Sequence, residues 1–120
     1  MLPEQESSLI MGLNEFEQAV TMQNQKKYDQ SEAYLKEALT ILKRAEQEKS
    51  LGYMLLLKRL AYVSFLNKKY ADSEKYFKVT TELAPHVTKN PVNIFQAKKN
   101  LLLFYTYTDL DKARSYTETL

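Results

Sequence analysis

The side chains that could support catalysis or hold a metal ion are few and isolated in this sequence. Its 120 residues include no cysteine and one histidine, His86, which follows Pro85 and has no metal-ligand spacing near it. Acidic pairs such as Asp109 and Asp111 are two residues apart, a spacing that does not place both carboxylates on one helix face. The two glycines stand alone, so no glycine-rich loop is available for a phosphate. We therefore predict that the protein is not an enzyme and needs no cofactor and no metal ion.

Basic and aromatic residues are the more informative group. The chain has nine tyrosines and five phenylalanines, and it has adjacent basic residues at 58–59 and 98–99. Further Lys-Lys pairs at 26–27 and 68–69 lie at expected turns, so the pairs do not form a continuous track for a phosphate backbone. A net charge of +2, from 17 basic and 15 acidic residues, requires neither a nucleic acid nor an anionic membrane as partner. We predict no nucleic-acid binding.

The composition predicts an all-α protein, because helix formers are abundant and only two glycines and three prolines interrupt them. Apolar residues recur at steps of three and four, which predicts six helices joined by short turns. Their expected ranges are 9–24, 28–45, 51–67, 70–84, 92–107 and 110–120. We expect residues 1–6 to be loose, Ser7 or Ser8 to cap the first helix, and Pro85 to end the fourth.

No stretch is apolar for long enough to cross a membrane. The longest apolar runs, 53–57 and 101–105, have five residues each, whereas a spanning helix needs about 20. Residues 1–8 contain two glutamates and no basic residue, so they do not resemble a secretory signal. We predict a soluble protein without membrane insertion, and on the same grounds a cytoplasmic one.

One stretch of the chain occurs twice. KKYDQSEAYLK at 26–36 returns as KKYADSEKYFK at 68–78, with seven of eleven positions identical at a displacement of 42 residues. Each copy begins at an expected turn and continues into an expected helix. Self-similarity at this period is typical of arrays in which each helical unit packs on the next.

The pattern within each unit resembles the tetratricopeptide repeat, a helix pair with small and aromatic residues at set positions. The matching positions in the second unit are Leu60, Ala61, Tyr70, Ser73, Phe77, Thr80 and the closing Pro85. Those in the first unit are Ala19, Tyr28, Ser31, Leu35 and Ala38, and those in a weaker third unit are Leu101, Leu102, Leu110, Ala113 and Thr117. The period of 42 exceeds the family's usual length of about 34 residues and is similar to that of kinesin light chain-like proteins.

The resemblance implies a right-handed α-solenoid of about three tetratricopeptide-like hairpins, with six antiparallel helices in one domain. The units would span about 9–49, 50–90 and 91–120, the last of them incomplete. The first helices of successive units in such arrays line a concave groove. The groove residues implied to bind a peptide or protein are Lys58, Arg59, Tyr62, Phe65, Lys98, Lys99 and Tyr105. Other positions implied to face the groove are Leu13, Phe16, Glu17, Val20, Leu55, Leu66, Phe95, Leu102 and Thr106.

A groove with cations beside aromatic rings suits a peptide that carries carboxylates and an apolar or aromatic anchor. We therefore predict a non-catalytic interaction module, an adaptor that binds a peptide or a protein surface. Two alternatives stay open: the lysines are ordinary solvated residues, or the chain is a structural scaffold subunit buried in a larger assembly. The C-terminal helix is a candidate oligomer or assembly contact, because no later element covers its apolar residues Leu110, Ala113, Tyr116 and Leu120.

Overall fold

The computed structural model describes residues 3–119, with side chains from residue 14 onward, and in this range the chain forms only helices and turns. The helices are α1 (Pro3–Asn24), α2 (Tyr28–Arg44), α3 (Leu51–Leu66), α4 (Tyr70–Val87), α5 (Pro91–Thr108) and α6 (Leu110–Thr117). This confirms the predicted all-α class. Leu9, Leu13 and Leu120, which contributed to the sequence patterns, lie outside the residues whose side chains are described.

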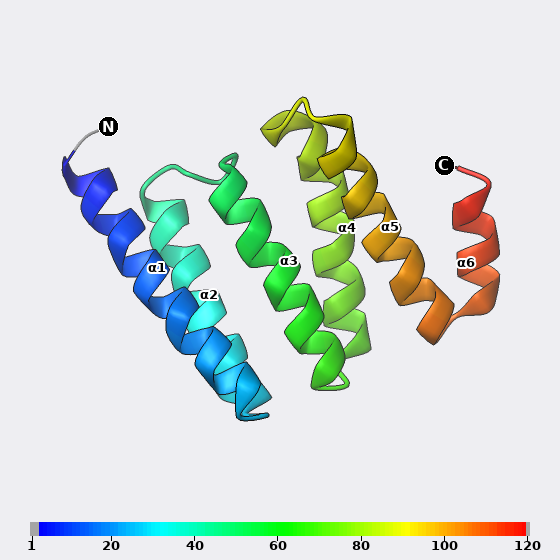
Figure 1. The fold of residues 1–120 in the computed structure, drawn as a ribbon, viewed down its shortest axis with the longest axis horizontal. Helices are drawn as coiled ribbons and strands as arrows, with labels where there is room; N and C mark the ends of the chain where they lie inside the picture. Colours follow the sequence, from blue (N-terminus) through cyan, green and yellow to red (C-terminus); the bar gives the residue numbers. More distant parts are fainter. Residues whose placement is uncertain (1–2, 120) are drawn as a thin grey trace.

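The helices form three consecutive hairpins that lie side by side (Figure 1). Within each hairpin α1 packs on α2, α3 on α4 and α5 on α6, and the hairpins are joined by packing of α2 on α3 and of α4 on α5. Close backbone packing is thus confined to helices that follow one another in the chain. The molecule measures 47 × 34 × 18 Å, and its smallest dimension corresponds to about two helix diameters of 10 Å each. The first helices α1, α3 and α5 lie on the face turned to the viewer in Figure 1.

The same hydrogen bond closes the first two hairpins. The Ser31 hydroxyl on α2 donates to the carbonyl oxygen of Ala19 on α1 at 2.7 Å, and the Ser73 hydroxyl on α4 donates to that of Ala61 on α3 at the same distance. All four residues are fully buried. The repeat in the sequence is therefore the repeat of a close contact between two helices.

Backbone geometry repeats at the hairpin turns as well. Lys26 and Lys68 have left-handed backbone conformations, with φ of 59° and 62°. The following lysine's N–H bonds to a carbonyl five residues earlier, from Lys27 to Met22 and from Lys69 to Ser64, both at 2.8 Å. This is the Schellman arrangement, which satisfies the last carbonyl groups of a helix.

The interior is divided between an aliphatic and an aromatic core. The aliphatic core joins α1, α2 and α3 and consists of Ala19, Leu35, Ala38, Leu39, Leu42, Leu56, Leu57, Leu60 and Val63. The aromatic core joins α3, α4, α5 and α6 and consists of Ala61, Phe77, Leu101, Phe104, Tyr105 and Ala113. A smaller cluster of Met54, Ala84 and Ala97 lies between α3, α4 and α5.

Two predicted helix boundaries were wrong. Helix α1 begins at Pro3, so Ser7 and Ser8 lie inside it, because proline's fixed φ suits the first helical turn, where its missing N–H is not needed. Pro85 does not end α4, which continues to Val87. A proline this close to the C-terminal end removes only its own backbone bond, and the Thr88 N–H still reaches the Ala84 carbonyl at 3.0 Å.

Side-chain caps begin α3 and α6. The Ser50 hydroxyl accepts a hydrogen bond from the Tyr53 N–H at the start of α3, at 3.1 Å. The Asp109 carboxylate accepts one from the Lys112 N–H at the start of α6, at 3.2 Å. Each satisfies an amide that the first turn of a helix leaves unpaired.

Candidate functional site

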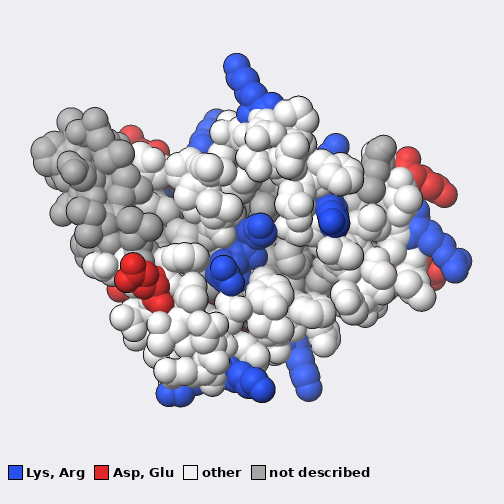
Figure 2. Space-filling view, in the orientation of Figure 1, with Lys and Arg blue, Asp and Glu red and all other residues white. Residues whose placement is uncertain are grey.

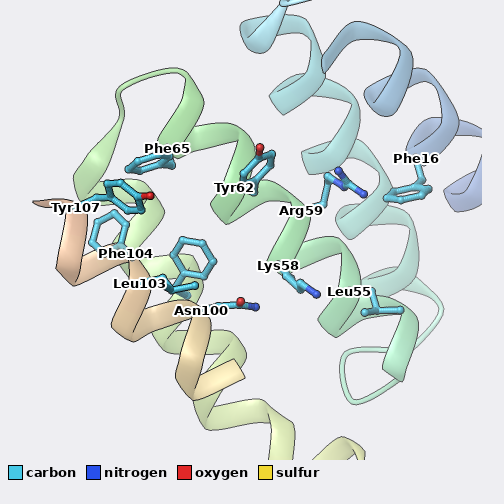
Figure 3. Close-up of a pocket in the computed structure, with 11 residues that line it drawn as sticks. Phe16, Leu55, Lys58, Arg59, Tyr62, Phe65, Asn100, Leu103, Phe104 and Tyr107 are labelled. Atoms are coloured by element: carbon cyan, nitrogen blue, oxygen red, sulfur yellow. The ribbon is translucent and has the colours of Figure 1, made fainter. Parts of the chain in front are cut away.

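A cleft of about 530 Å³ opens between α3 and α5 on the face formed by the first helices (Figure 3). Most of its wall is apolar, with aromatic side chains from four helices. The residues that line it are Phe16, Leu55, Lys58, Arg59, Tyr62, Phe65, Phe77, Asn100, Leu103, Phe104 and Tyr107. Its volume lies within the usual range of ligand sites, about 300 to 1,000 Å³.

The cleft exists because α4 separates α3 from α5. The backbone of α4 packs closely on both, whereas α3 and α5 meet mainly through side chains such as Phe65 and Phe104. The Phe77 ring of α4 lies 5.7 Å from the Phe104 ring of α5, and these two side chains are buried at the base. Above them, Tyr62 and Leu103 are nearly half exposed and Tyr107 is 78% exposed. Exposed apolar area of this kind, gathered in one concave place, is typical of a binding surface.

Cations lie at one end of the cleft. Lys58 is exposed and Arg59 is half buried on successive positions of α3, and Figure 3 shows both toward the end of the cleft nearest Phe16. The Arg59 guanidinium donates to the Gln23 side-chain oxygen at 3.1 Å and lies 5.8 Å from the centre of the Phe16 ring. Both partners belong to α1, so the guanidinium is held in place from the neighbouring hairpin.

Acidic side chains are absent from the lining residues of the cleft. Figure 2 shows basic side chains near the middle of this face, while the acidic ones visible on it lie toward the periphery. Because most of the cleft wall is apolar, the two cations there attract an anion more strongly than they would in open water.

The other end of the cleft is aromatic. The Phe65 ring lies 6.2 Å from the Phe104 ring, 6.1 Å from the Tyr107 ring and 5.6 Å from the Tyr70 ring. The interplanar angles of 55° to 74° are those of tilted and edge-on pairs, which are favourable arrangements for aromatic rings. Ring edges and faces therefore remain available to an apolar group that enters from solvent.

Four of the seven predicted peptide-binding residues line the cleft, and all four come from α3: Lys58, Arg59, Tyr62 and Phe65. Phe16 and Leu55, two further positions expected to face the groove, also line it. The mostly apolar sequence of α3 is interrupted by the large polar side chains Lys58, Arg59 and Tyr62, while its Ser64 is buried. These three large side chains determine how α3 is rotated about its axis, because the helix must bury its apolar side chains and leave the large polar ones facing solvent.

Tyr105 does not face the cleft, and its expected place there was wrong. It is 5% exposed, and its hydroxyl donates to the Glu74 carboxylate on α4 at 2.8 Å. Burial and this bond to an anion raise the pKa of Tyr105 well above its ordinary value. Its ring also packs edge-on against Tyr116 of α6 at 5.9 Å. Tyr105 is thus part of the packing between α4, α5 and α6.

Lys98 and Lys99 are also absent from the cleft lining, contrary to the sequence prediction. Helix α5 buries Ala97, Leu101, Phe104 and Tyr105, which turns a different side of the helix toward α3. The residues on that side are Asn100, Leu103, Phe104 and Tyr107, spaced as one helical face. Phe95, Leu102 and Thr106 likewise do not line the cleft.

Sequence reasoning missed Asn100, Leu103, Phe104 and Tyr107 of α5 and Phe77 of α4. A weak signal for the first group existed, because their spacing of three, four and seven residues marks a helical stripe. Phe77 was assigned only to packing, and it does pack, but it also forms the base of the cleft.

No cluster of three or more histidine or acidic side chains suited to a metal ion occurs among the described residues. Over the same part of the chain, no helix is long and apolar enough to cross a membrane. The cleft offers hydrogen-bond donors at one end and aromatic rings at the other. A comparison of the chain with known protein families, curated proteins and solved structures finds no match.

Proposed function

We propose that the protein is a non-catalytic interaction module, a tetratricopeptide-like array that binds a peptide segment of another protein in the cleft between α3 and α5. The observation that carries this proposal is the combination of exposed apolar side chains with Lys58 and Arg59 in one concave surface without acidic residues. The fitting ligand is a segment with an aromatic or aliphatic anchor and at least one carboxylate.

Two physical arguments support this ligand. Burying an apolar anchor among Phe65, Phe104 and Tyr107 removes apolar area of both partners from water, which is the main favourable term in association. A carboxylate at Lys58 and Arg59 forms charge-assisted hydrogen bonds, which are shorter and stronger than neutral ones. Because Arg59 is already held by Gln23 and Phe16, less side-chain entropy is lost when the ligand binds.

The alternative role is that of a structural scaffold subunit in a larger assembly, and one contact expected for it, through α6, has less support. The expected uncovered face of α6 is partly covered, because Ala113 is buried and Tyr116 packs on Tyr105. Leu110 is 61% exposed, and most other described residues of α6 are polar. A single exposed leucine is ordinary for a soluble helix.

The test is a panel of fluorescent decapeptides with one tryptophan or phenylalanine and two acidic residues in a Gly-Ser background, with neutral Asn/Gln and basic Lys versions as comparison. Fluorescence polarisation should show tightest binding for the acidic aromatic peptides. The double variant Lys58→Gln/Arg59→Gln should weaken it about 10-fold or more, because a hydrogen bond to a charged group contributes about 1.5 to 3 kcal/mol.

The matched control is Lys98→Gln/Lys99→Gln, which removes the same charge outside the cleft. It should leave the affinity within about twofold, apart from a long-range charge effect that salt suppresses. Circular dichroism of both double variants establishes that they are folded. Equal losses in the two variants, or no binding by any acidic aromatic peptide, would remove the cleft as a peptide site.

A further inference from the structure

The cleft between α3 and α5 has the size and closure of a site for a small molecule as well as a peptide. Its base is made by buried Phe77 and Phe104 and its sides by α3 and α5, so a compact apolar body would be surrounded on three sides. Sites of a few hundred cubic ångströms with mostly apolar walls and a few polar groups are the usual form of small-ligand pockets.

The polar and apolar groups of the cleft are separated along its length. Lys58 and Arg59 lie toward one end and Phe65, Phe104 and Tyr107 toward the other (Figure 3). Lys58 and Phe65 are seven positions apart on α3, which corresponds to about 10 Å along the helix axis. A ligand that uses both ends therefore has one anionic group and an apolar body of about that length.

The cationic end of the cleft favours ligands with a negative charge. Lys58 and Arg59 are the charged residues of the lining, and Asn100 on α5 adds an amide. The Asn100 side-chain oxygen accepts a bond from Gln96 at 3.2 Å, so its amide N–H groups remain available to a ligand. Donors without a carboxylate partner among the lining residues disfavour an ammonium group and favour a carboxylate.

We propose that this cleft also binds small amphipathic carboxylates, such as medium-chain alkanoates or aryl-alkanoates, and that these molecules compete with the peptide. The carboxylate is bound by Lys58 and Arg59, and the apolar body lies over Leu103 and Phe104 toward Tyr107. The competition rests on the peptide-binding function proposed above, whereas the binding of the carboxylate does not.

The direct test is isothermal titration calorimetry with hexanoate, octanoate, decanoate and dodecanoate, each below its micelle-forming concentration. Each added methylene group should raise the affinity up to about fourfold while it is buried, from about 0.8 kcal/mol per group. The rise should level off once the chain is longer than the cleft. The alcohol and the amine of the same chain length should bind at least about 10-fold more weakly than the carboxylate.

Variants then locate the site. Lys58→Gln/Arg59→Gln should reduce the affinity for decanoate to that for decanol, while Leu103→Asp should weaken the binding of both. Lys98→Gln/Lys99→Gln should change neither. Lack of octanoate and decanoate binding, equal affinity for decanol, or an equal loss in the Lys98/Lys99 variant would overturn the proposal.

A displacement experiment separates this proposal from the proposed peptide function. Decanoate should release a bound acidic aromatic peptide from the protein with an inhibition constant equal to its calorimetric Kd. If decanoate binds and no peptide of the panel does, the peptide function fails and the carboxylate site stands. If a peptide binds and decanoate neither binds nor displaces it, the carboxylate site fails alone.

Discussion

The two junctions between hairpins have the same topology and different side chains. At the first, α2 packs on α3 through Leu39, Leu42, Leu56 and Leu57, all in the aliphatic core. At the second, α4 and α5 meet through Phe77, Phe104 and Tyr105 in the aromatic core. Branched aliphatic side chains interlock and fill the space between helices, whereas the rings of the second junction leave a cleft of about 530 Å³ beside them.

Each junction has a polar interaction made by a glutamate at the same position of the repeat. Glu32 on α2 pairs with Lys69 of the next hairpin at 2.7 Å, and Glu74, 42 residues later, accepts bonds from Tyr105 and Lys112 of the third hairpin. Glu32 is 3% exposed, and its second carboxylate oxygen has no partner among the described residues. The bond to the Glu32 carboxylate raises the pKa of Lys69.

The first two hairpins thus share their close helix contacts and the two junctions have equivalent polar interactions, while the side chains of the second junction leave an open cleft. Leu35 of the first hairpin and Phe77 of the second occupy equivalent positions of the duplicated sequence. The leucine is fully buried, and the phenylalanine forms part of the cleft wall. We therefore expect the first junction to be tightly packed and the second to adapt to substitutions.

The largest effect is expected from a cavity in the aliphatic core. Leu60→Ala removes a side chain that is fully buried and should lower the free energy of unfolding by about 2 to 5 kcal/mol. Phe104→Leu at the second junction should cost less than about 1.5 kcal/mol, because the cleft lets neighbouring rings readjust. Urea denaturation measures both values. A larger loss for Phe104→Leu would mean that the second junction is packed as tightly as the first.

The next effect concerns the close contact inside the second hairpin. Ala61→Leu adds volume at a fully buried position opposite Ser73 and should cost about 1 to 3 kcal/mol through overpacking. Ala71→Leu makes the same change at an exposed position of α4 and should stay within about 0.5 kcal/mol. Thermal melts compare the two variants, and an unchanged midpoint for Ala61→Leu would contradict the described contact.

The serine bonds allow all three hairpins to be compared. Ser31→Ala and Ser73→Ala each remove one buried hydrogen bond and should each cost about 1 kcal/mol. Ala113 holds the corresponding place in the third hairpin, so Ala113→Ser should add a bond to α5 and stabilise the protein by up to about 1 kcal/mol. Destabilisation by Ala113→Ser would show that the two helices of the third hairpin are not placed for the hydrogen bond found in the first two.

Acid should weaken the second junction through Glu74. Burial by itself would raise the pKa of Glu74, but hydrogen bonds from Tyr105 and Lys112 and the nearby Lys78 charge outweigh it, so the pKa lies below its ordinary value of 4.5. The ionised carboxylate therefore contributes stability above pH 4.5, and this contribution disappears as the pH falls through the folded-state pKa. Denaturation midpoints measured from pH 7 downward should fall less steeply for Glu74→Gln. If the midpoints of the unsubstituted protein and of Glu74→Gln fall in parallel with pH, Glu74 is not the source of the acid sensitivity.

The smallest effect is expected at the turns. Lys68 has a φ of 62°, a conformation that is unfavourable for a residue with a side chain and easy for glycine. Lys68→Gly should stabilise the protein by about 0.5 to 1 kcal/mol, after the greater entropy of the unfolded glycine chain is subtracted. Lys27→Gly, at a turn position with a φ outside the left-handed region, is the control and should destabilise. A loss of stability in both variants would contradict the left-handed turn.

Much of the fold could be predicted from particular residues. The duplicated Lys-Lys-Tyr stretch marks the turns and second helices of two hairpins, and Ser50 and Asp109 mark helix starts. The α3 side of the cleft was also predictable, from the pattern of polar residues along that helix. The large polar side chains Lys58, Arg59 and Tyr62 share one side of α3, so they could be placed on its exposed face.

The α5 half of the cleft could not be predicted. Residues 101–105 are all apolar, so the sequence is compatible with several rotations of α5 about its axis. Contacts with other helices select one: Phe104 packs on Phe77, and the Tyr105 hydroxyl reaches Glu74. This rotation moves Lys98, Lys99 and Tyr105 away from the cleft and brings Leu103 and Tyr107 into it.

From the sequence alone one could predict which segments are helices, where most of them begin, and which residues lie at the close contacts within the first two hairpins. Those properties depend on local backbone preferences, on caps and on periodicity, all of which act over a few residues. The rotation of α5 about its axis, and the cleft between α5 and α3, became apparent only in the tertiary structure. Both outcomes depend on the volumes of side chains from different helices that must share one space, and the residues that meet there are 27 to 39 positions apart in the chain.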